Sequence, residues 1–335
     1  MKVITFGEIM ARFSPEGYKR FLQADHFEIN YGGAEVNVAV ALSSFGIETE
    51  FVTKLPDNEI AQAAINKLRS FDVGTKYIVR GGRRMGTYFL EKGFDARPSK
   101  VIYDRENSAI SQAEIGEFDW DKIFEGADWF HFTGITAALS DTCAKMCYNA
   151  VRNAKEKGII VSCDTNYRKK LWSIEKANEV MSKLMPYVDV CINPLGMFGF
   201  IVEDKISVTD INSTEKLKKI NSELIQKFGF KKTAYLLRDN VNSNGNKLSA
   251  VYFDGKDYYY TKEQEVNIID RVGGGDSFGA GLIYSMLNMF GPQKAIEFAV
   301  AASCLKHTIA GDFNMTTVDE VNKLANGDSS GRVQR

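Results

Sequence analysis

Residues 268–287 read IIDRVGGGDSFGAGLIYSML, and this stretch decides the predicted fold. A short β-like run ends at Asp270, glycines occupy positions 273 to 275, and Asp276 follows them. Apolar residues at positions 278, 282, 283 and 286 then recur at helical spacing. The stretch therefore predicts a strand, a tight glycine turn and a helix, which together form the building unit of an α/β fold.

The glycine turn has a chemical consequence. The first amides of a helix have no partner within it and carry a partial positive charge. Because Gly273, Gly274 and Gly275 lack Cβ atoms, phosphate oxygens could approach those amides closely. Asp276 would stand at the mouth of this anion hole, where it could accept a proton from an attacking hydroxyl. We expect the helix terminus to keep Asp276 ionised, although an aspartate that merely caps the helix is the simpler alternative.

The remainder of the chain alternates between strand and helix patterns. From residue 129 onward, predicted strands at 129–134, 159–164, 188–193 and 232–238 are separated by helices at 141–157, 174–185 and 214–228. This rhythm predicts a three-layer α/β/α domain with a central, mostly parallel sheet. More β-rich segments at 10–31 and 77–105 predict a small β lid at the carboxyl edge of the sheet, where ligands bind in such folds. The main domain would then comprise residues 1–9, 32–76 and 106–320, followed by a terminal tail at 321–335.

Composition limits the classes of function. The chain has 335 residues, 44% of them apolar, and a formal net charge of −1, so no basic surplus points to nucleic acid or an anionic membrane as a partner. No stretch approaches the ~18 apolar residues of a membrane span. The five cysteines are odd in number and lie in apolar segments, which predicts buried thiols in a reducing cytoplasm.

Several established motifs are absent from the sequence. No Gly-Lys pair is followed by Ser or Thr, as a P-loop requires, and the early glycine pair lacks the spacing of a dinucleotide fingerprint. Neither the HRD motif of protein kinases nor an HExxH zinc motif occurs. Phosphoryl transfer, if the chain performs it, must therefore use the glycine turn.

A second glycine pair lies near the N-terminus, in the segment YGGAEVNVAVALSSFG at residues 31–46. Together with the later turn, about 240 residues away, it resembles the paired signatures of the ribokinase-like (PfkB) carbohydrate kinases. The resemblance implies a ribokinase-like fold that uses ATP and Mg²⁺, with dependence on a monovalent cation left open. It also implies that Gly33 and Asn37 meet the sugar, and that the Asp-x-x-Gly-x-Gly-Asp run from Asp270 to Asp276 carries the anion hole and the base.

Two further segments suggest an acidic substrate. Tyr103 and Arg105 would share one face of a lid strand, and an arginine beside an aromatic ring suits a small carboxylate. Arg168 follows a predicted buried strand at its carboxyl end, where a phosphate or acid group would sit. From the residues alone, an exposed lid arginine and a basic surface cluster remain the alternatives.

Within the PfkB family, the segments DRVGGGDSF, DTNYRKKLW and FTGITAALS resemble the 2-keto-3-deoxygluconate kinases. This resemblance implies ATP-dependent phosphorylation of 2-keto-3-deoxygluconate at its terminal 6-hydroxyl, in Entner–Doudoroff or hexuronate catabolism. The implied substrate contacts are Gly33, Asn37, Tyr88, Tyr103, Arg105, Arg168 and Asp312. The implied nucleotide contacts are Asn166, Arg168, Leu237, Arg238, Gly273 and Gly275.

Two positions depart from the family pattern. Arg12 stands where many members have an aspartate, and it would either favour an anionic ligand or face solvent. Gly196 stands where a glutamate commonly organises magnesium; Glu203 or Asp204 could substitute, and no metal ligand is assigned.

Alternative functions remain open at this point. One is a kinase of a neutral sugar such as fructose or ribose, which Arg12, Tyr103 and Arg105 speak against. Another is a catalytically silent ligand-binding member of the family. Exposed lid edges suggest a homo-oligomer.

Overall fold

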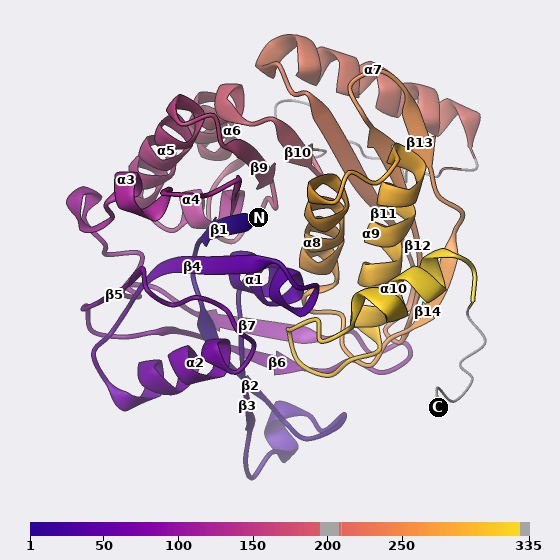
Figure 1. The fold of residues 1–335 in the computed structure, drawn as a ribbon. Coiled ribbons are helices and arrows are strands. Elements are labelled where there is room, and N and C mark those ends of the chain that lie inside the picture. Colours follow the sequence, from indigo (N-terminus) through magenta and orange to yellow (C-terminus); the bar gives the residue numbers. More distant parts are fainter. Residues whose placement is uncertain (195–207, 209, 329–335) are drawn as a thin grey trace.

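The computed structural model describes residues 1–194, 208 and 210–328. Its main sheet has the strand order β13-β12-β11-β10-β9-β8-β1-β4-β5, with β14 also paired to β12 (Figure 1). From β5 to β11 neighbouring strands are parallel, and β12 runs antiparallel to β11, β13 and β14. The strands are β1 (Lys2–Phe6), β4 (Glu48–Leu55), β5 (Ile78–Arg80), β8 (Trp129–Thr133), β9 (Ile160–Asp164), β10 (Val190–Ile192), β11 (Lys232–Asn242), β12 (Gly245–Phe253), β13 (Tyr258–Tyr260) and β14 (Gln264–Asn267).

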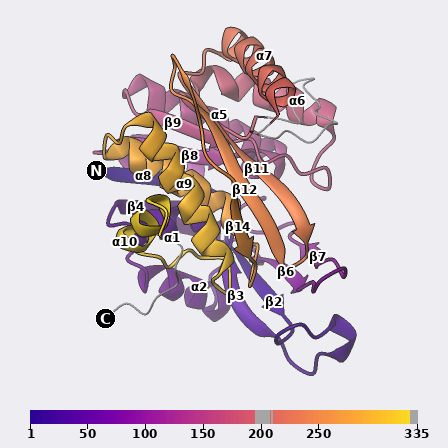
Figure 2. The same cartoon turned by 90° about the vertical axis from the view of Figure 1, so that its right-hand side faces the viewer.

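Helices cover both faces of this sheet, as predicted (Figures 1 and 2). One face packs against α1 (Ala34–Ser44), α8 (Gly274–Leu287), α9 (Pro292–His307) and α10 (Val318–Ala325). The other packs against α3 (Trp120–Ile123), α5 (Asp141–Glu156), α6 (Ile174–Leu184) and α7 (Ile211–Phe228). The short α4 (Gly134–Ala138) follows β8, and α2 (Glu59–Arg69) joins β4 to β5. The predicted three-layer α/β/α class is therefore confirmed.

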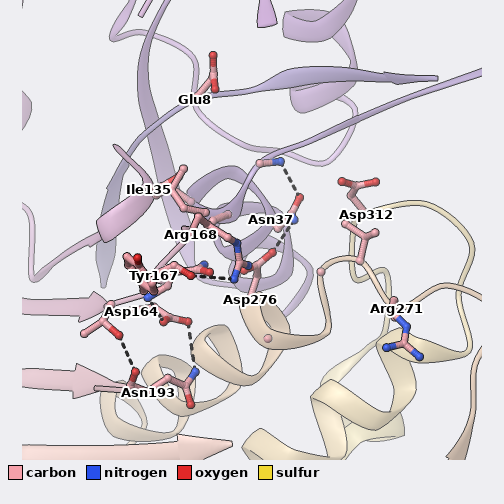
Figure 3. Close-up of a pocket in the computed structure, with 18 of the residues that line it drawn as sticks. Glu8, Asn37, Ile135, Asp164, Tyr167, Arg168, Asn193, Arg271, Asp276 and Asp312 are labelled. Carbon is pink, nitrogen blue, oxygen red and sulfur yellow. Dashed lines mark hydrogen bonds between the residues drawn. The ribbon is translucent and has the colours of Figure 1, made fainter. Parts of the chain in front are cut away.

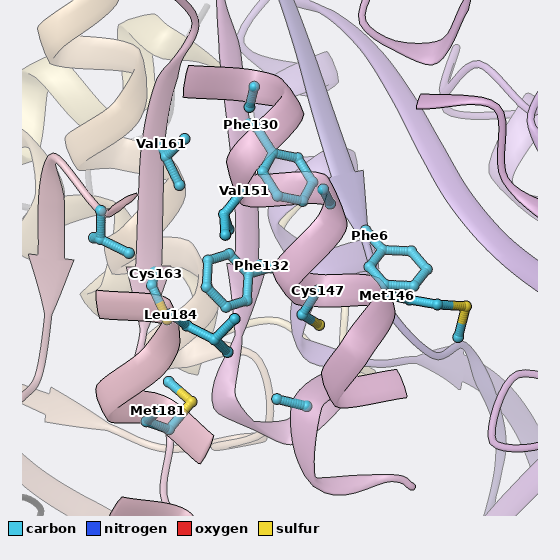
Figure 4. Packing of buried hydrophobic residues seen from close by; sticks show 14 of the residues in the cluster. Phe6, Phe130, Phe132, Met146, Cys147, Val151, Val161, Cys163, Met181 and Leu184 are labelled. Atoms are coloured by element: carbon cyan, nitrogen blue, oxygen red, sulfur yellow. The ribbon is translucent and has the colours of Figure 1, made fainter. Parts of the chain in front are cut away.

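Strand β8 shows how the sequence builds two cores at once. Successive residues of a strand point to opposite faces of a sheet. Trp129 accordingly packs among α1, α8 and α9, whereas Phe130 and Phe132 pack against α5 and α6 (Figure 4). The rings of Phe130 and Phe132 stack with centroids 5.8 Å apart. A strand buried on both faces must be almost wholly apolar, which explains its sequence WFHFT.

A second sheet forms the lid, with the order β3-β2-β6-β7. Its strands are β2 (Met10–Ser14), β3 (Glu28–Gly32), β6 (Gly86–Glu91) and β7 (Lys100–Asp104). The register places Asn30, Arg12, Tyr88 and Tyr103 in one row across the four strands, and Ile29, Phe13, Phe89 and Ile102 in the next. Adjacent rows face opposite sides, so the lid presents a polar inner row toward the main domain and an apolar outer row.

Two predicted boundaries are wrong. Residues 78–80 were placed in the lid, but β5 pairs in parallel with β4 at the edge of the main sheet, because the α2 crossover returns the chain beside β4. The tail predicted from residue 321 begins inside α10, whose Val321 is fully buried. Residues 329–335 lie outside the described part of the chain.

The described residues contain no helix long and apolar enough to cross a membrane. All five cysteines are buried and free, as their apolar surroundings predicted.

Candidate active site

A cavity of about 600 Å³ lies at the carboxyl edge of the main sheet, beneath the lid. Its wall combines the ends of several parallel strands with Tyr88 and Tyr103 of the inner row of the lid. All the predicted site residues except Gly274 line it, namely Gly33, Asn37, Tyr88, Tyr103, Arg105, Asn166, Arg168, Leu237, Arg238, Gly273, Gly275, Asp276 and Asp312.

The glycine turn is built so closely that larger residues would not fit. Gly273 caps α8 in the left-handed region, with φ of 83°, and a Cβ there would lie 2.0 Å from the carbonyl oxygen of Asp312. A Cβ on Gly274 would lie 2.3 Å from the ring of His307, so this glycine faces the core instead of the cavity. A Cβ on Gly275 would lie 2.9 Å from Nη2 of Arg238, which places that guanidinium over the turn.

The amides of the turn are largely free. The Gly274 amide makes a long contact of 3.4 Å with the carbonyl of Arg271, and the Ser277 amide is the first to bond within the helix, at 2.8 Å to Gly273. The amides of Gly275 and Asp276 donate no hydrogen bond to any of the described residues. Because both residues line the cavity, the start of α8 offers two unpaired donors to an anion.

Asp276 lies on the third residue of α8 and accepts a hydrogen bond from Nδ2 of Asn37 at 2.6 Å (Figure 3). Burial raises the pKa of Asp276 to about 7, with the charge of Asp164 adding to the effect and the Asn37 hydrogen bond opposing it. The helix terminus is predicted to keep this carboxylate ionised, and desolvation opposes that effect. A pKa near neutrality is nevertheless what a general base working at pH 7 needs.

Asn37 is held by the first glycine signature. Its Oδ1 accepts the amide of Gly33 at 3.3 Å, so its Nδ2 is directed at Asp276. A Cβ on Gly33 would lie 2.0 Å from the carbonyl oxygen of Glu8, so glycine allows the start of α1 to approach the segment after β1 this closely. The two signatures thus meet at one hydrogen bond, although their residues lie 239 positions apart.

Sequence reasoning missed Glu8. This residue follows β1, is 2% exposed, and accepts both Nε (2.7 Å) and Nη2 of Arg105 on a single oxygen, Oε2. Its other oxygen, Oε1, is buried without a partner among the described residues. The Arg105 guanidinium also lies 5.7 Å from the Tyr103 ring centroid, so the predicted pairing of these two side chains is present. Glu8 lies just beyond a buried strand, as Arg168 does. The signal that identified Arg168 could therefore have identified Glu8 as well.

Both sequence-based expectations for Arg12 are wrong. Its side chain is 1% exposed and does not line the cavity. Its Nη2 bonds Asp270 at 2.5 Å and its Nη1 bonds Asp312 at 2.8 Å, while Tyr88 donates its hydroxyl to the other oxygen of Asp312. Two buried carboxylates require a compensating cation, and Arg12 supplies it from the lid.

The opposite side of the cavity carries the residues predicted to meet the nucleotide. Asp164 ends β9, accepts the amide of Asn166 at 3.0 Å and contacts Nδ2 of Asn193 at 3.4 Å (Figure 3). Burial raises the pKa of Asp164 to about 6, with the Arg168 charge opposing this effect. Arg168 is exposed on the cavity wall and forms no ion pair with a described residue.

The donors for a divalent cation are sparse. No group of three histidine, cysteine or acidic side chains able to hold a metal occurs among the described residues, and Gly196, Glu203 and Asp204 lie outside them. Asp164 is nevertheless a carboxylate on the wall beside Arg168 and Asn193. This arrangement suits Mg²⁺, which is commonly held by one or two carboxylates, water and substrate phosphates.

Known carbohydrate kinases resemble this chain in sequence and in fold. The model of the pfkB family carbohydrate kinases matches residues 1–316. The solved 2-dehydro-3-deoxygluconokinase of Thermotoga maritima is 48% identical, covers 98% of this chain and 100% of its own, and superposes with a TM-score of 0.93. The 2-dehydro-3-deoxygalactonokinase of Haloferax volcanii is 31% identical, with 98% of each chain covered. The 2-dehydro-3-deoxygluconokinase of Bacillus subtilis is 26% identical over 94% of this chain and 92% of its own.

Proposed function

The chain belongs to the pfkB family of carbohydrate kinases, and from this premise we propose that it transfers the γ-phosphoryl group of ATP to the 6-hydroxyl of 2-keto-3-deoxygluconate (2-dehydro-3-deoxygluconate). The product is 2-keto-3-deoxy-6-phosphogluconate. The observation that carries the proposal is the pairing of a basic carboxylate with two free helix amides in one cavity, beside arginines that suit an acid.

Asp276 acts as the general base. When the terminal hydroxyl of the sugar enters, the proton of this hydroxyl passes to the carboxylate as its oxygen attacks the γ-phosphorus. The bond between that phosphorus and the bridging oxygen of ADP then breaks. Asn37 keeps the carboxylate oriented and partly ionised, which its hydrogen bond of 2.6 Å achieves.

The amides of Gly275 and Asp276 hold the charge on the transferring group, and the guanidinium of Arg238 lies over the same turn. Gly273 and Gly274 allow the turn to pack against Asp312 and His307. Asp164 would hold Mg²⁺ beside the nucleotide, where the ion would neutralise phosphate charge.

The acid end of the substrate lies between Arg168 of the main domain and Arg105 at the lid. Glu8 already balances the charge of Arg105, whereas Arg168 forms no ion pair with a described residue. Arg168 therefore attracts the carboxylate more strongly, and Arg105 contributes its remaining N–H groups from beside Tyr103. Tyr88 and Asp312 complete the sugar side of the wall.

We also propose a cytoplasmic homo-oligomer. Five free, buried cysteines suit a reducing compartment. On the outer row of the lid, Ile29 and Ile102 are 57% and 55% exposed and flank Phe13 and Phe89. A contiguous apolar row on an open sheet is a typical subunit interface, because its exposure to water is unfavourable.

A substrate panel tests the proposal. Purified enzyme with ATP and Mg²⁺ should phosphorylate 2-keto-3-deoxygluconate with a kcat/KM at least tenfold above fructose and ribose. The Asp276→Asn variant should lose about 10²–10⁴-fold in kcat. Faster turnover of a neutral sugar would favour the first alternative. Heat stabilisation by ligands without release of ADP would favour a silent binding protein.

A further inference from the structure

A cluster of buried charges lies behind the glycine turn and has no part in the proton transfer. Arg12 comes from the lid, Asp270 from the segment before the turn, and Asp312 from the loop after α9. Their exposed fractions are 1%, 3% and 3%. Lys306 is fully buried nearby, and its Nζ donates to the carbonyl of Ile309 at 3.1 Å.

The two aspartates of this cluster contact the turn from both sides, Asp270 through its carboxylate and Asp312 through its backbone carbonyl. Asp270 accepts the amides of Val272 at 3.2 Å and Gly311 at 3.2 Å, so it fixes the chain entering the turn. The carbonyl oxygen of Asp312 packs against Gly273, where a Cβ would lie only 2.0 Å away. Movement of the Asp270 side chain or of the Asp312 backbone is therefore transmitted to the first amides of α8.

Arg12 joins both carboxylates to the lid. One amine of its guanidinium bonds each of them, at 2.5 and 2.8 Å, and its Nε donates to Ser14 on the same strand at 2.9 Å. Tyr88, on the neighbouring lid strand, donates to Asp312 as well. The planar guanidinium of Arg12 is bonded to three side chains, and this fixes the orientation of the lid strand relative to the turn.

Stability alone does not account for this cluster. Replacing buried ion pairs by apolar residues of similar volume is often neutral or stabilising, so such a pair is weak evidence for a stabilising role. Other lid-to-body hydrogen bonds lie at the β11–β12 turn, where Asp95 and Arg97 bond Ser243 and Asn244. Lys92 of the lid adds a longer ion pair to Asp270, at 3.9 Å.

We propose that Arg12 is a positioning residue that couples the lid to the anion hole, so that phosphoryl transfer proceeds only with the sugar in register. The inference rests on the proposed function. With Arg12 in place, the polar inner row of the lid and the amides of α8 keep a fixed separation, and the sugar hydroxyl reaches the γ-phosphorus. With the coupling broken, the lid no longer excludes water from the turn. Water then attacks the same phosphorus, loses a proton to Asp276, and ATP yields ADP and inorganic phosphate.

The test compares Arg12→Lys with Arg84→Lys. Arg84 is a matched control because it is also a lid arginine bonded to an aspartate, Asp104 at 2.7 Å, but this pair stays within the lid. A lysine at position 12 keeps the charge but cannot bond both carboxylates as a fork. ADP and phosphorylated sugar are measured together, on the panel sugar that wild-type enzyme phosphorylates fastest.

Wild type and Arg84→Lys should release one ADP per phosphorylated sugar. Arg12→Lys should lose about 10²-fold in sugar turnover, the cost of a misplacement of about 1 Å. Its ratio of ADP to phosphorylated sugar should rise severalfold above one. An Arg12→Lys enzyme with a lower Tm but unchanged kcat and a ratio of one would overturn the proposal, because it would show a structural role only.

A second variant guards against poor folding of the first. Asp270→Asn keeps the side-chain shape but removes the charge that Arg12 meets, and it should raise the same ratio. In the double variant the two effects should not add, since both break one coupling. Additive losses, or a ratio of one in Asp270→Asn, would contradict the coupling. If the proposed substrate is wrong, the wild-type enzyme will prefer another sugar. The ratio of ADP to phosphorylated sugar is then measured on that sugar, so the coupling is tested independently of the substrate assignment.

Discussion

Replacing Asn37 with alanine should move the pH dependence of the reaction. The Asn37 hydrogen bond of 2.6 Å lowers the pKa of Asp276 against the effect of burial, which raises that pKa to about 7. A hydrogen bond to a charged group is worth about 1.5–3 kcal/mol. Because one pKa unit corresponds to about 1.4 kcal/mol, loss of this bond should raise the pKa of Asp276 to about 8–9.

The sign of the effect follows from the role of the base. Only ionised Asp276 accepts a proton, so kcat/KM increases with pH through its pKa. In the variant, the ionised fraction at pH 7 should fall from about one half to about 1–10%. The acid limb of the profile should therefore move upward by about one to two pH units, and part of the loss at pH 7 should be recovered at pH 9.

The assay is kcat/KM for the keto acid from pH 5 to 10, at saturating ATP. Asn58→Ala serves as a control, because Asn58 caps α2 by accepting the Ala61 amide at 2.9 Å. This change should lower stability by about 1 kcal/mol and leave the limb in place. Contact of Asn37 with the sugar would lower kcat/KM at every pH without moving the limb. An acid limb at the same pH in Asn37→Ala and wild type would refute the assignment of Asp276 as the titrating base.

Three further predictions concern the turn, the histidines and the lid. Gly273→Ala should abolish turnover, because its φ of 83° and the Asp312 carbonyl at 2.0 Å exclude a Cβ. The control Gly17→Ala, with φ of 57° and open space around it, should keep full kcat. Equal activity in both variants would contradict this prediction. Burial lowers the pKa of His131 to about 3 and that of His307 to about 4, so both stay neutral in the fold while unfolded histidines take up protons below pH ~6.5. Stability should therefore fall as pH drops from about 6.5 toward 4, and His131→Gln should flatten the slope of the unfolding free energy by up to about 1.4 kcal/mol per pH unit; an unchanged slope in urea titrations would refute this. Ile29→Lys combined with Ile102→Lys should yield monomers in sedimentation analysis with kcat retained, and an unchanged mass would exclude the outer lid row as the interface.

The sequence alone determined the elements and the chemistry of the turn. Alternating apolar runs predicted the layers, the β-rich segments predicted a lid, and the glycine run predicted the exposed amides of α8. These features depend on neighbours in the chain, because periodicity, capping and backbone freedom are local properties. The strand before the turn was predicted to end at Asp270, whereas β14 ends at Asn267. The amides of Ile269 and Asp270 bond the carbonyl of His307 and not a neighbouring strand.

Only the tertiary structure decided how the charges pair. Arg12 meets Asp312 across 300 positions, and Arg105 meets Glu8 across 97, so no local pattern revealed either pair. The pKa of Asp276 likewise depends on how completely its surroundings exclude water, which is set by the closure of the cavity by α1, β9 and the lid. Local sequence places a carboxylate at the start of a helix, whereas desolvation and distant partners determine the pH at which it works.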